Sequence, residues 1–172
     1  CIRKRLMSGV HPAIVGTPEP LGTAHWLWPN ELATRTFAQA LAQQALLQNA
    51  YIELAGDLGA GKTTFVRYLL KALGVQGRIK SPTYAVVEPY ELANGLNIWH
   101  FDFYRFNDPD EWEEAGFREL FASPGLKLAE WASHAGPHIP PADLVIAIDT
   151  ADSDARSVTL SAQTDTGARL LP

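Results

Sequence analysis

One short segment limits what this chain can fold into more than any other feature of the sequence. It spans residues 56–63 and matches the pattern G-x-x-x-x-G-K-[ST] at every required position: Gly56-Asp57-Leu58-Gly59-Ala60-Gly61-Lys62-Thr63. An apolar run at 50–55 precedes it, and a helical pattern at 62–73 follows and stops at Gly74. In such a strand–loop–helix unit, loop N–H groups and the positive helix end hold phosphate oxygens. We therefore predict that residues 56–63 bind a nucleoside triphosphate together with magnesium.

Two side chains at the end of this loop have distinct expected roles. Lys62 would reach the β- and γ-phosphates as a point charge, and the hydroxyl of Thr63 would bind Mg²⁺. The chain has no Asn-Lys-x-Asp segment of the kind that reads guanine, which makes GTP the less favoured nucleotide. The other predicted nucleotide contacts in and next to the loop are Asp57, Leu58, Gly59, Ala60, Gly61 and Thr64.

Asp102 is the first candidate for completing a magnesium site. It lies in the predicted strand 98–104, on one face together with His100, while aromatic residues occupy the other face. A carboxylate in this setting is costly to bury unless a cation or a hydrogen-bond donor meets it. We predict a magnesium contact for Asp102, with a salt bridge to Arg105 as the structural alternative. We expect His100 to be a satisfied strand histidine rather than a general base.

Glu130 is the second candidate carboxylate. It ends the predicted strand 126–130, and open α/β sheets bind their ligands at the carboxyl ends of strands. Its expected role is to contact the metal or to orient an attacking water. On these features alone, an ordinary surface acid at a strand end is an equally good interpretation.

The segment Ser81-Pro82-Thr83 follows the predicted phosphate helix after a short loop. Pro82 stiffens it and biases Ser81 away from helical conformation. The hydroxyl of Thr83 would be able to sense a γ-phosphate, as nucleotide switch loops do. Local physics alone favours an ordinary turn, so both interpretations stay open here.

Composition narrows the class of protein further. The chain has 172 residues, of which 47% are apolar and 19% charged, and this suits one folded domain with one core. Its net charge of −5 argues against autonomous binding to nucleic acid. The single cysteine excludes a disulfide framework and fits a reducing, cytoplasmic location. No apolar run approaches the roughly 20 residues that a membrane helix needs.

The predicted elements alternate between strands and helices, which indicates an α/β fold. A flexible leader at 1–24 precedes one domain at 25–172; either Met7 is the natural start or the first residues derive from an expression vector. A helix begins at an Asn30 cap and ends near Gln48, and another begins at 108–111 and continues to Phe121. The predicted strands are 26–28, 50–55, 84–90, 98–104 and 126–130, followed by a hairpin of 143–149 with 157–161.

Four motifs in order point to one family. The phosphate loop with Thr64 comes first, followed by Ser81-Pro82-Thr83-Tyr84, then His100-Phe101-Asp102-Phe103-Tyr104-Arg105, then Glu130-Trp131. Their order and spacing resemble the bacterial TsaE (YjeE) family, small ATPases that support threonylcarbamoyladenosine modification of tRNA. The resemblance covers roughly residues 25–161. The chain departs from it after Trp131, where the family commonly has Pro then Glu and this chain has Ala132 and Ser133.

The resemblance implies a three-layer P-loop nucleotide-binding domain with a mixed, mainly parallel central sheet. It implies that Thr63, Asp102 and Glu130 lie at the magnesium, and that Thr83 lies in a switch-like loop at the nucleotide. Lys62, Asp102 and Glu130 are accordingly the predicted catalytic residues.

The resemblance also implies partner proteins of the TsaB and TsaD types. ATP hydrolysis would reset or activate their complex, and the chain would reach the anticodon-loop adenosine of tRNA only through that complex. Turnover by the chain alone is expected to be slow, since no arginine finger is built into the loop. Two alternatives stay open: a small-molecule or nucleotide kinase, although no Arg-rich lid is present, and a non-catalytic ATP-gated binding module.

Overall fold

Seven strands form one mixed sheet in a computed structural model that describes residues 19–172. The spatial order is β1-β7-β6-β2-β5-β4-β3. The four central strands β6, β2, β5 and β4 pair in parallel, and β1, β7 and β3 join antiparallel, which confirms the predicted mixed sheet. The strands are β1 (Gly22–Trp28), β2 (Tyr51–Ala55), β3 (Val87–Glu91), β4 (Asn97–Asp102), β5 (Leu126–Glu130), β6 (Leu144–Thr150) and β7 (Arg156–Ala162).

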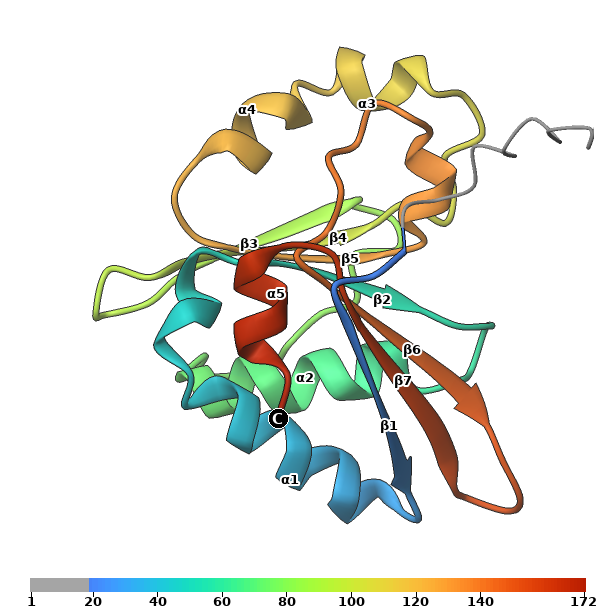
Figure 1. Ribbon diagram of the computed structural model, residues 1–172. Coiled ribbons are helices and arrows are strands. Elements are labelled where there is room, and N and C mark those ends of the chain that lie inside the picture. Colours follow the sequence, from blue (N-terminus) through green and yellow to red (C-terminus); the bar gives the residue numbers. More distant parts are fainter. Residues whose placement is uncertain (1–18) are drawn as a thin grey trace, which may run out of the picture.

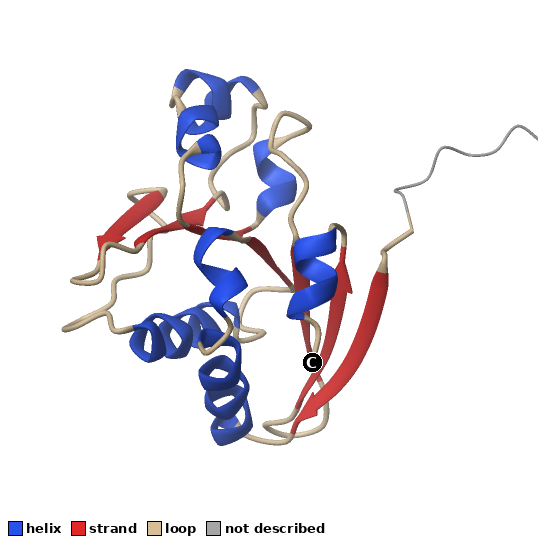
Figure 2. Ribbon diagram, turned by 60° about the vertical axis from the view of Figure 1, so that its left-hand side comes forward, coloured by secondary structure: helices blue, strands red, loops and turns tan. Residues whose placement is uncertain are grey.

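Helices cover both faces of this sheet, so the fold has three layers (Figure 1, Figure 2). One face carries α1 (Glu31–Ala42), α2 (Lys62–Leu73), α5 (Asp165–Leu170) and the 3₁₀ helix η1 (Ala45–Asn49). The other face carries α3 (Asp110–Glu114), α4 (Phe117–Ala122) and the 3₁₀ helix η2 (Ala132–Ala135). Within residues 19–172, none of the helices has the length and apolar character needed to cross a bilayer.

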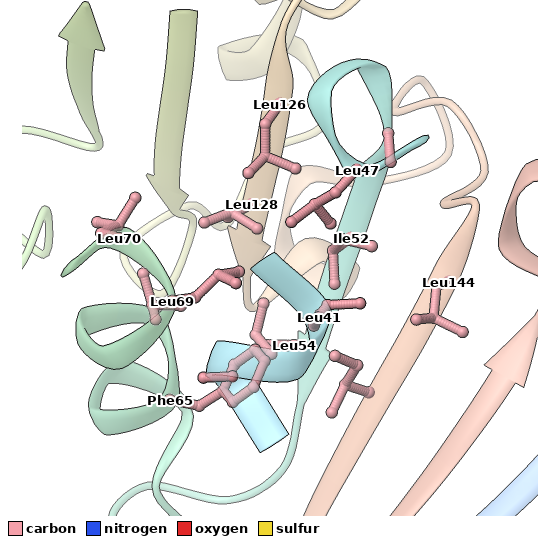
Figure 3. Close-up of a cluster of buried hydrophobic side chains, with 14 of the residues drawn as sticks. Leu41, Leu47, Ile52, Leu54, Phe65, Leu69, Leu70, Leu126, Leu128 and Leu144 are labelled. Carbon is pink, nitrogen blue, oxygen red and sulfur yellow. The ribbon is translucent and has the colours of Figure 1, made fainter. Parts of the chain in front are cut away.

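Each face of the sheet has its own apolar cluster. Under α1 and α2, Ile52 and Leu54 of β2 pack with Phe65 and with leucines of α2 and β5 (Figure 3). Under α3 and α4, the cluster is aromatic and includes Phe101 and Trp112. Central parallel strands are normally buried on both faces, and this burial makes the carboxyl ends of β2, β5 and β4 a rigid support for the loops that follow them.

The N-terminal helix is shorter than predicted. Asn30 does cap it, because its side chain accepts a hydrogen bond from the Ala33 N–H at 3.0 Å. The helix ends at Ala42, however, and not near Gln48, and η1 follows. The separate turn buries Leu47 completely and brings the chain into β2, so tertiary packing overrides the apolar periodicity there.

Two further elements differ from the prediction because of left-handed backbone. The strand predicted at 84–90 begins only at Val87, since Val86 has a φ of 69° and its N–H closes a turn on the Pro82 carbonyl at 2.7 Å. The single helix predicted to continue to Phe121 is broken into α3 and α4 at Gly116, whose φ is 74°.

The boundaries at the chain ends also differ from the prediction. Strand β1 begins at Gly22 and pairs with β7 from there, so it includes residues that we had placed in the leader. Residues 1–18 of the predicted leader lie outside the described residues. Strand β4 ends at Asp102, two residues before the predicted end, and α5 had not been predicted. The hairpin of β6 and β7 is confirmed.

Candidate nucleotide and magnesium site

The loop between β2 and α2 has a backbone that only glycine can follow at two positions. Gly56 has a φ of 142°, and a Cβ built on it would lie 2.3 Å from the Ile148 carbonyl oxygen. Gly61 caps α2 with a φ of 113°. These left-handed residues let the loop leave β2, pass close under the end of β6 and wrap back to begin α2.

The start of α2 presents backbone donors toward this loop. The first helical hydrogen bond runs from the Phe65 N–H to the Gly61 carbonyl at 3.0 Å. The N–H groups of Lys62, Thr63 and Thr64 come before it, so the helix itself offers them no acceptor. Donors in this position, together with the positive end of the helix dipole, suit an anion such as a phosphate.

Lys62 is held inside the loop. Its side chain is only 5% exposed, and Nζ donates to the carbonyls of Gly56 and, at 3.0 Å, of Asp57. Nζ also lies 4.2 Å from the centre of the Trp131 ring. Burial lowers the pKa of Lys62, while nearby carboxylates, chiefly Glu130, act in the opposite direction. A phosphate beside this ammonium would stabilise its charged form.

Two carboxylates lie side by side at the ends of β4 and β5. Asp102 and Glu130 are paired residues in the parallel register, and they are 6% and 2% exposed. Glu130 Oε1 accepts a hydrogen bond from the Thr63 hydroxyl at 2.8 Å, and Oε2 lies 2.7 Å from Nε2 of His100. The site carboxylate on β5 is therefore held from both α2 and β4.

Asp102 has its own set of partners. Oδ1 accepts from the Tyr104 N–H at 2.9 Å, and Oδ2 accepts from the Thr83 hydroxyl at 3.2 Å. The alternative partner, Arg105, forms no salt bridge with Asp102. Instead, Arg105 lies over the Tyr84 ring, 4.1 Å from its centre. Asp102 thus faces the phosphate loop and is tied to the loop that carries Thr83.

The donor set fits a magnesium ion that keeps water and phosphate oxygens among its ligands. The Thr63 hydroxyl donates its hydrogen bond to Glu130, so the lone pairs of the Thr63 oxygen remain free to bind a cation. The carboxylates of Asp102 and Glu130 supply hard oxygen ligands of the kind that magnesium prefers. In the part of the chain that the structure describes, no three His, Cys, Asp or Glu side chains form a metal-holding cluster. A magnesium ion held here would therefore need water or phosphate oxygens among its ligands.

Two hollows flank the phosphate loop and meet at Gly61 and Thr64. The first, the phosphate cleft, has a volume of about 280 Å³. The second, the side pocket, has a volume of about 510 Å³ and lies toward β1, α1 and β7. The phosphate cleft is lined by Leu58, Gly59, Gly61, Lys62, Thr63, Thr64, Thr83, Asp102, Tyr104, Glu130 and Trp131.

Most of the predicted site residues thus gather in one place. Among those predicted to contact the nucleotide, Ala60 lines the side pocket instead of the cleft, and Asp57 lines neither hollow. Thr83 lies in a turn, as local physics favours, and also reaches Asp102, so its two interpretations are compatible. The roles of all these residues stay predictions.

Sequence reasoning missed one residue at this site and assigned no role to a second. Arg156 begins β7 and donates from Nε to the Ala60 carbonyl at 2.8 Å, which ties β7 to the phosphate loop. No local pattern indicates this contact, because it depends on how β7 pairs with β6. Trp131 lies over Lys62 and has a left-handed backbone with a φ of 57°. The sequence places it in the Glu130-Trp131 motif, but nothing in that motif indicates a contact with Lys62.

The fold and the site together define a class: a mixed α/β protein with a glycine-rich loop between β2 and α2 and two buried carboxylates beside it. A family model described as threonylcarbamoyl adenosine biosynthesis protein TsaE matches residues 28–158. The chain belongs to this TsaE family.

Individual relatives agree with this assignment. The chain is 42% identical over 137 residues to a Haemophilus influenzae protein named tRNA threonylcarbamoyladenosine biosynthesis protein TsaE, covering 80% of this chain and 85% of that protein. A Bacillus subtilis protein of the same name is 35% identical over 137 residues, with 80% and 84% covered. The crystal structure of Bacillus subtilis YdiB superposes with a TM-score of 0.72 at 29% identity, covering 87% of this chain and 91% of that one.

The close approach at Gly56 generates a first prediction. In Gly56→Ala the added Cβ would collide with the Ile148 carbonyl, so the loop must shift, and the rise in melting temperature that we expect ATP to cause in the parent should disappear. Gly74→Ala is a matched control, because Gly74 has a φ of 111° but nothing lies within 4 Å of its added Cβ. It should lose only about 1–2 kcal/mol of stability and keep the ATP-induced shift. An undiminished shift in Gly56→Ala would contradict this account of the loop.

The buried pair of His100 and Glu130 generates a second prediction. His100→Leu would leave Glu130 Oε2 without its donor and should lower the free energy of unfolding by about 1–3 kcal/mol in urea denaturation. His100→Gln retains an N–H donor and should recover a large part of that loss. Equal destabilisation by both substitutions would show that shape, and not the hydrogen bond, is what matters at this position.

Proposed function

We propose that this chain is a magnesium-dependent ATPase that supports threonylcarbamoyladenosine modification of tRNA together with partners of the TsaB and TsaD types. The observation that carries the ATPase part is the convergence of Lys62, Thr63, Asp102 and Glu130 on one cleft beside the loop donors. The names of the relatives at 42% and 35% identity support the pathway.

The two hollows suggest how a nucleotide would lie. Its triphosphate would occupy the phosphate cleft, against the N–H groups at the start of α2 and the ammonium of Lys62. Its ribose and base would extend past Gly61 and Thr64 into the side pocket, which is lined in part by Trp28, Thr34 and Arg156. The volume of about 510 Å³ is sufficient for a nucleoside.

Thr63, Asp102 and Glu130 would hold the magnesium ion at the γ-phosphate end of the cleft. When bound, magnesium neutralises charge on the β- and γ-phosphates. Lys62 would add a second positive charge at the same oxygens. Glu130, fixed by Thr63 and His100, would contact the metal or orient a water for in-line attack on the γ-phosphate.

The small number of cations in the phosphate cleft supports the proposal that ATP hydrolysis depends on partner proteins. Among its lining residues in the described chain, Lys62 is the one cation. Arg156 bonds to Ala60 on the other side of the loop, in the side pocket. In P-loop enzymes, an arginine at the γ-phosphate accelerates hydrolysis by about 10³–10⁵, and it can come from another protein. A chain without such an arginine should turn over slowly by itself.

The decisive experiment measures ATP hydrolysis by the chain alone, with TsaB- and TsaD-type proteins, and with those proteins plus tRNA. Turnover that is slow alone and stimulated by the partners supports the proposal. Lys62→Ala, which removes the charge from the loop, should abolish both the turnover and the ATP-induced thermal shift. ATP binding without turnover in any mixture would favour a non-catalytic binding module, and phosphate transfer to a small molecule would favour a kinase.

Removal of one predicted metal ligand gives a separate prediction. Asp102→Asn keeps the shape of the side chain but removes its charge, so magnesium-dependent turnover should fall by about 100-fold. The thermal shift with ATP in EDTA should persist, because the loop donors remain. Asp165→Asn, at an exposed position in α5, is the control and should leave both readouts unchanged. Undiminished turnover in Asp102→Asn would exclude the metal role.

A further inference from the structure

A third hollow, separate from the phosphate cleft and the side pocket, is lined by four basic side chains. Its volume is about 610 Å³, and it lies along the second half of α2 and the loop that follows this helix. Four exposed cations line it, Arg67 and Lys71 from α2 and Arg78 and Lys80 from the loop. We call these four residues the basic surface.

Within residues 19–172, the four cations of the basic surface form no ion pair and no side-chain hydrogen bond. In residues 19–172, the ion pairs involve His100, Arg118 and His138, and none includes one of its four cations. Arg67 and Lys71 stand one helical turn apart, a spacing at which like charges repel. The buried or half-buried cations Lys62, Lys127 and Arg156, by contrast, all donate hydrogen bonds within the fold. Four cations gathered in a chain of net charge −5 therefore point to a ligand outside the chain.

Two hydrogen bonds connect the hollow of the basic surface to the phosphate cleft. Ser81 lines the same hollow and shares a hydrogen bond of 2.9 Å with the Thr83 hydroxyl. Thr83 in turn donates to Asp102 at 3.2 Å. A ligand that moves the loop at 78–81 would thus act on a predicted magnesium ligand through two hydrogen bonds.

Charge favours an acidic protein surface over RNA as the ligand. An RNA is a long polyanion, so its phosphates would extend past the four cations of the basic surface. There they would be repelled by the rest of this chain, whose net charge is −5. A patch of carboxylates on a partner protein is local and can match the basic surface without meeting the rest of the chain. Among the residues that line the hollow, the apolar one is Ile79, and none is an aromatic ring on which a base would stack.

We propose that the basic surface docks an acidic patch of a partner protein and that this contact sets the position of Thr83 against Asp102. The proposal rests on the partner dependence proposed above, and it names the region of this chain where the partner acts. Attraction between complementary charges would speed association and orient the partner.

Charge reversal tests this assignment. Arg67→Glu with Lys71→Glu, and separately Arg78→Glu with Lys80→Glu, should each weaken binding to an immobilised complex of TsaB- and TsaD-type proteins by at least about tenfold. Partner-stimulated ATP turnover should fall accordingly, while turnover of the chain alone and the ATP-induced thermal shift stay unchanged. Arg35→Glu with Arg169→Glu changes the net charge equally at exposed positions elsewhere and should bind as the parent does. Binding of the parent should weaken as salt is raised.

Each other outcome overturns the inference in a distinct way. If both reversed pairs bind the partner complex as the parent does, the basic surface is not the docking site. If the control pair loses binding equally, net charge and not position is responsible. If labelled tRNA alone binds the parent and loses binding on charge reversal, the surface recognises nucleic acid instead. If the parent itself never binds the partners, the proposed function fails, and this inference fails with it.

Discussion

The parallel register of β4 and β5 is the constraint on which the candidate site depends. It places Asp102 opposite Glu130, and the pairing of β5 with β2 places Glu130 opposite Leu54, just before the phosphate loop. A slip of one residue in either pairing would turn a carboxylate to the other face of the sheet. The apolar clusters on both faces oppose such a slip, since it would expose buried residues and bury polar ones. The chemistry of the site is therefore held by the core beneath it.

The site buries several polar and charged side chains, and removing such groups from water costs free energy. Lys62, His100, Asp102 and Glu130 are all buried, and hydrogen bonds to backbone or to one another offset part of the cost. One ring nitrogen of His100, Nδ1, is buried without a partner. Charges kept in a fixed arrangement at the expense of stability are typical of functional sites, because they need little reorganisation when a charged ligand arrives.

The elements that were predicted correctly are those whose structure depends on residues close together in the sequence. The strand–loop–helix unit around residues 56–61, the Asn30 cap and the strand at 126–130 each follow from a short pattern, and the structure has them as expected. The break at Gly116 and the turn at Val86 depend on left-handed backbone that helical or strand periodicity does not encode. The contact of Arg156 with Ala60 is harder to predict than these backbone features. The two residues are far apart in the sequence, and the order of the strands in the sheet brings them together. Long-range pairing therefore accounts for what sequence reasoning missed.

The central claim is that one cleft holds a magnesium–triphosphate between the loop after β2 and the carboxylates of β4 and β5. A crystal structure of the chain with Mg²⁺ and a non-hydrolysable ATP analogue tests it most directly. The account predicts the γ-phosphate against Lys62 and the metal about 2.1 Å from the Thr63 hydroxyl oxygen, with Asp102 and Glu130 bound to it directly or through water. A nucleotide bound away from residues 56–63, or a metal held by other side chains, would contradict it.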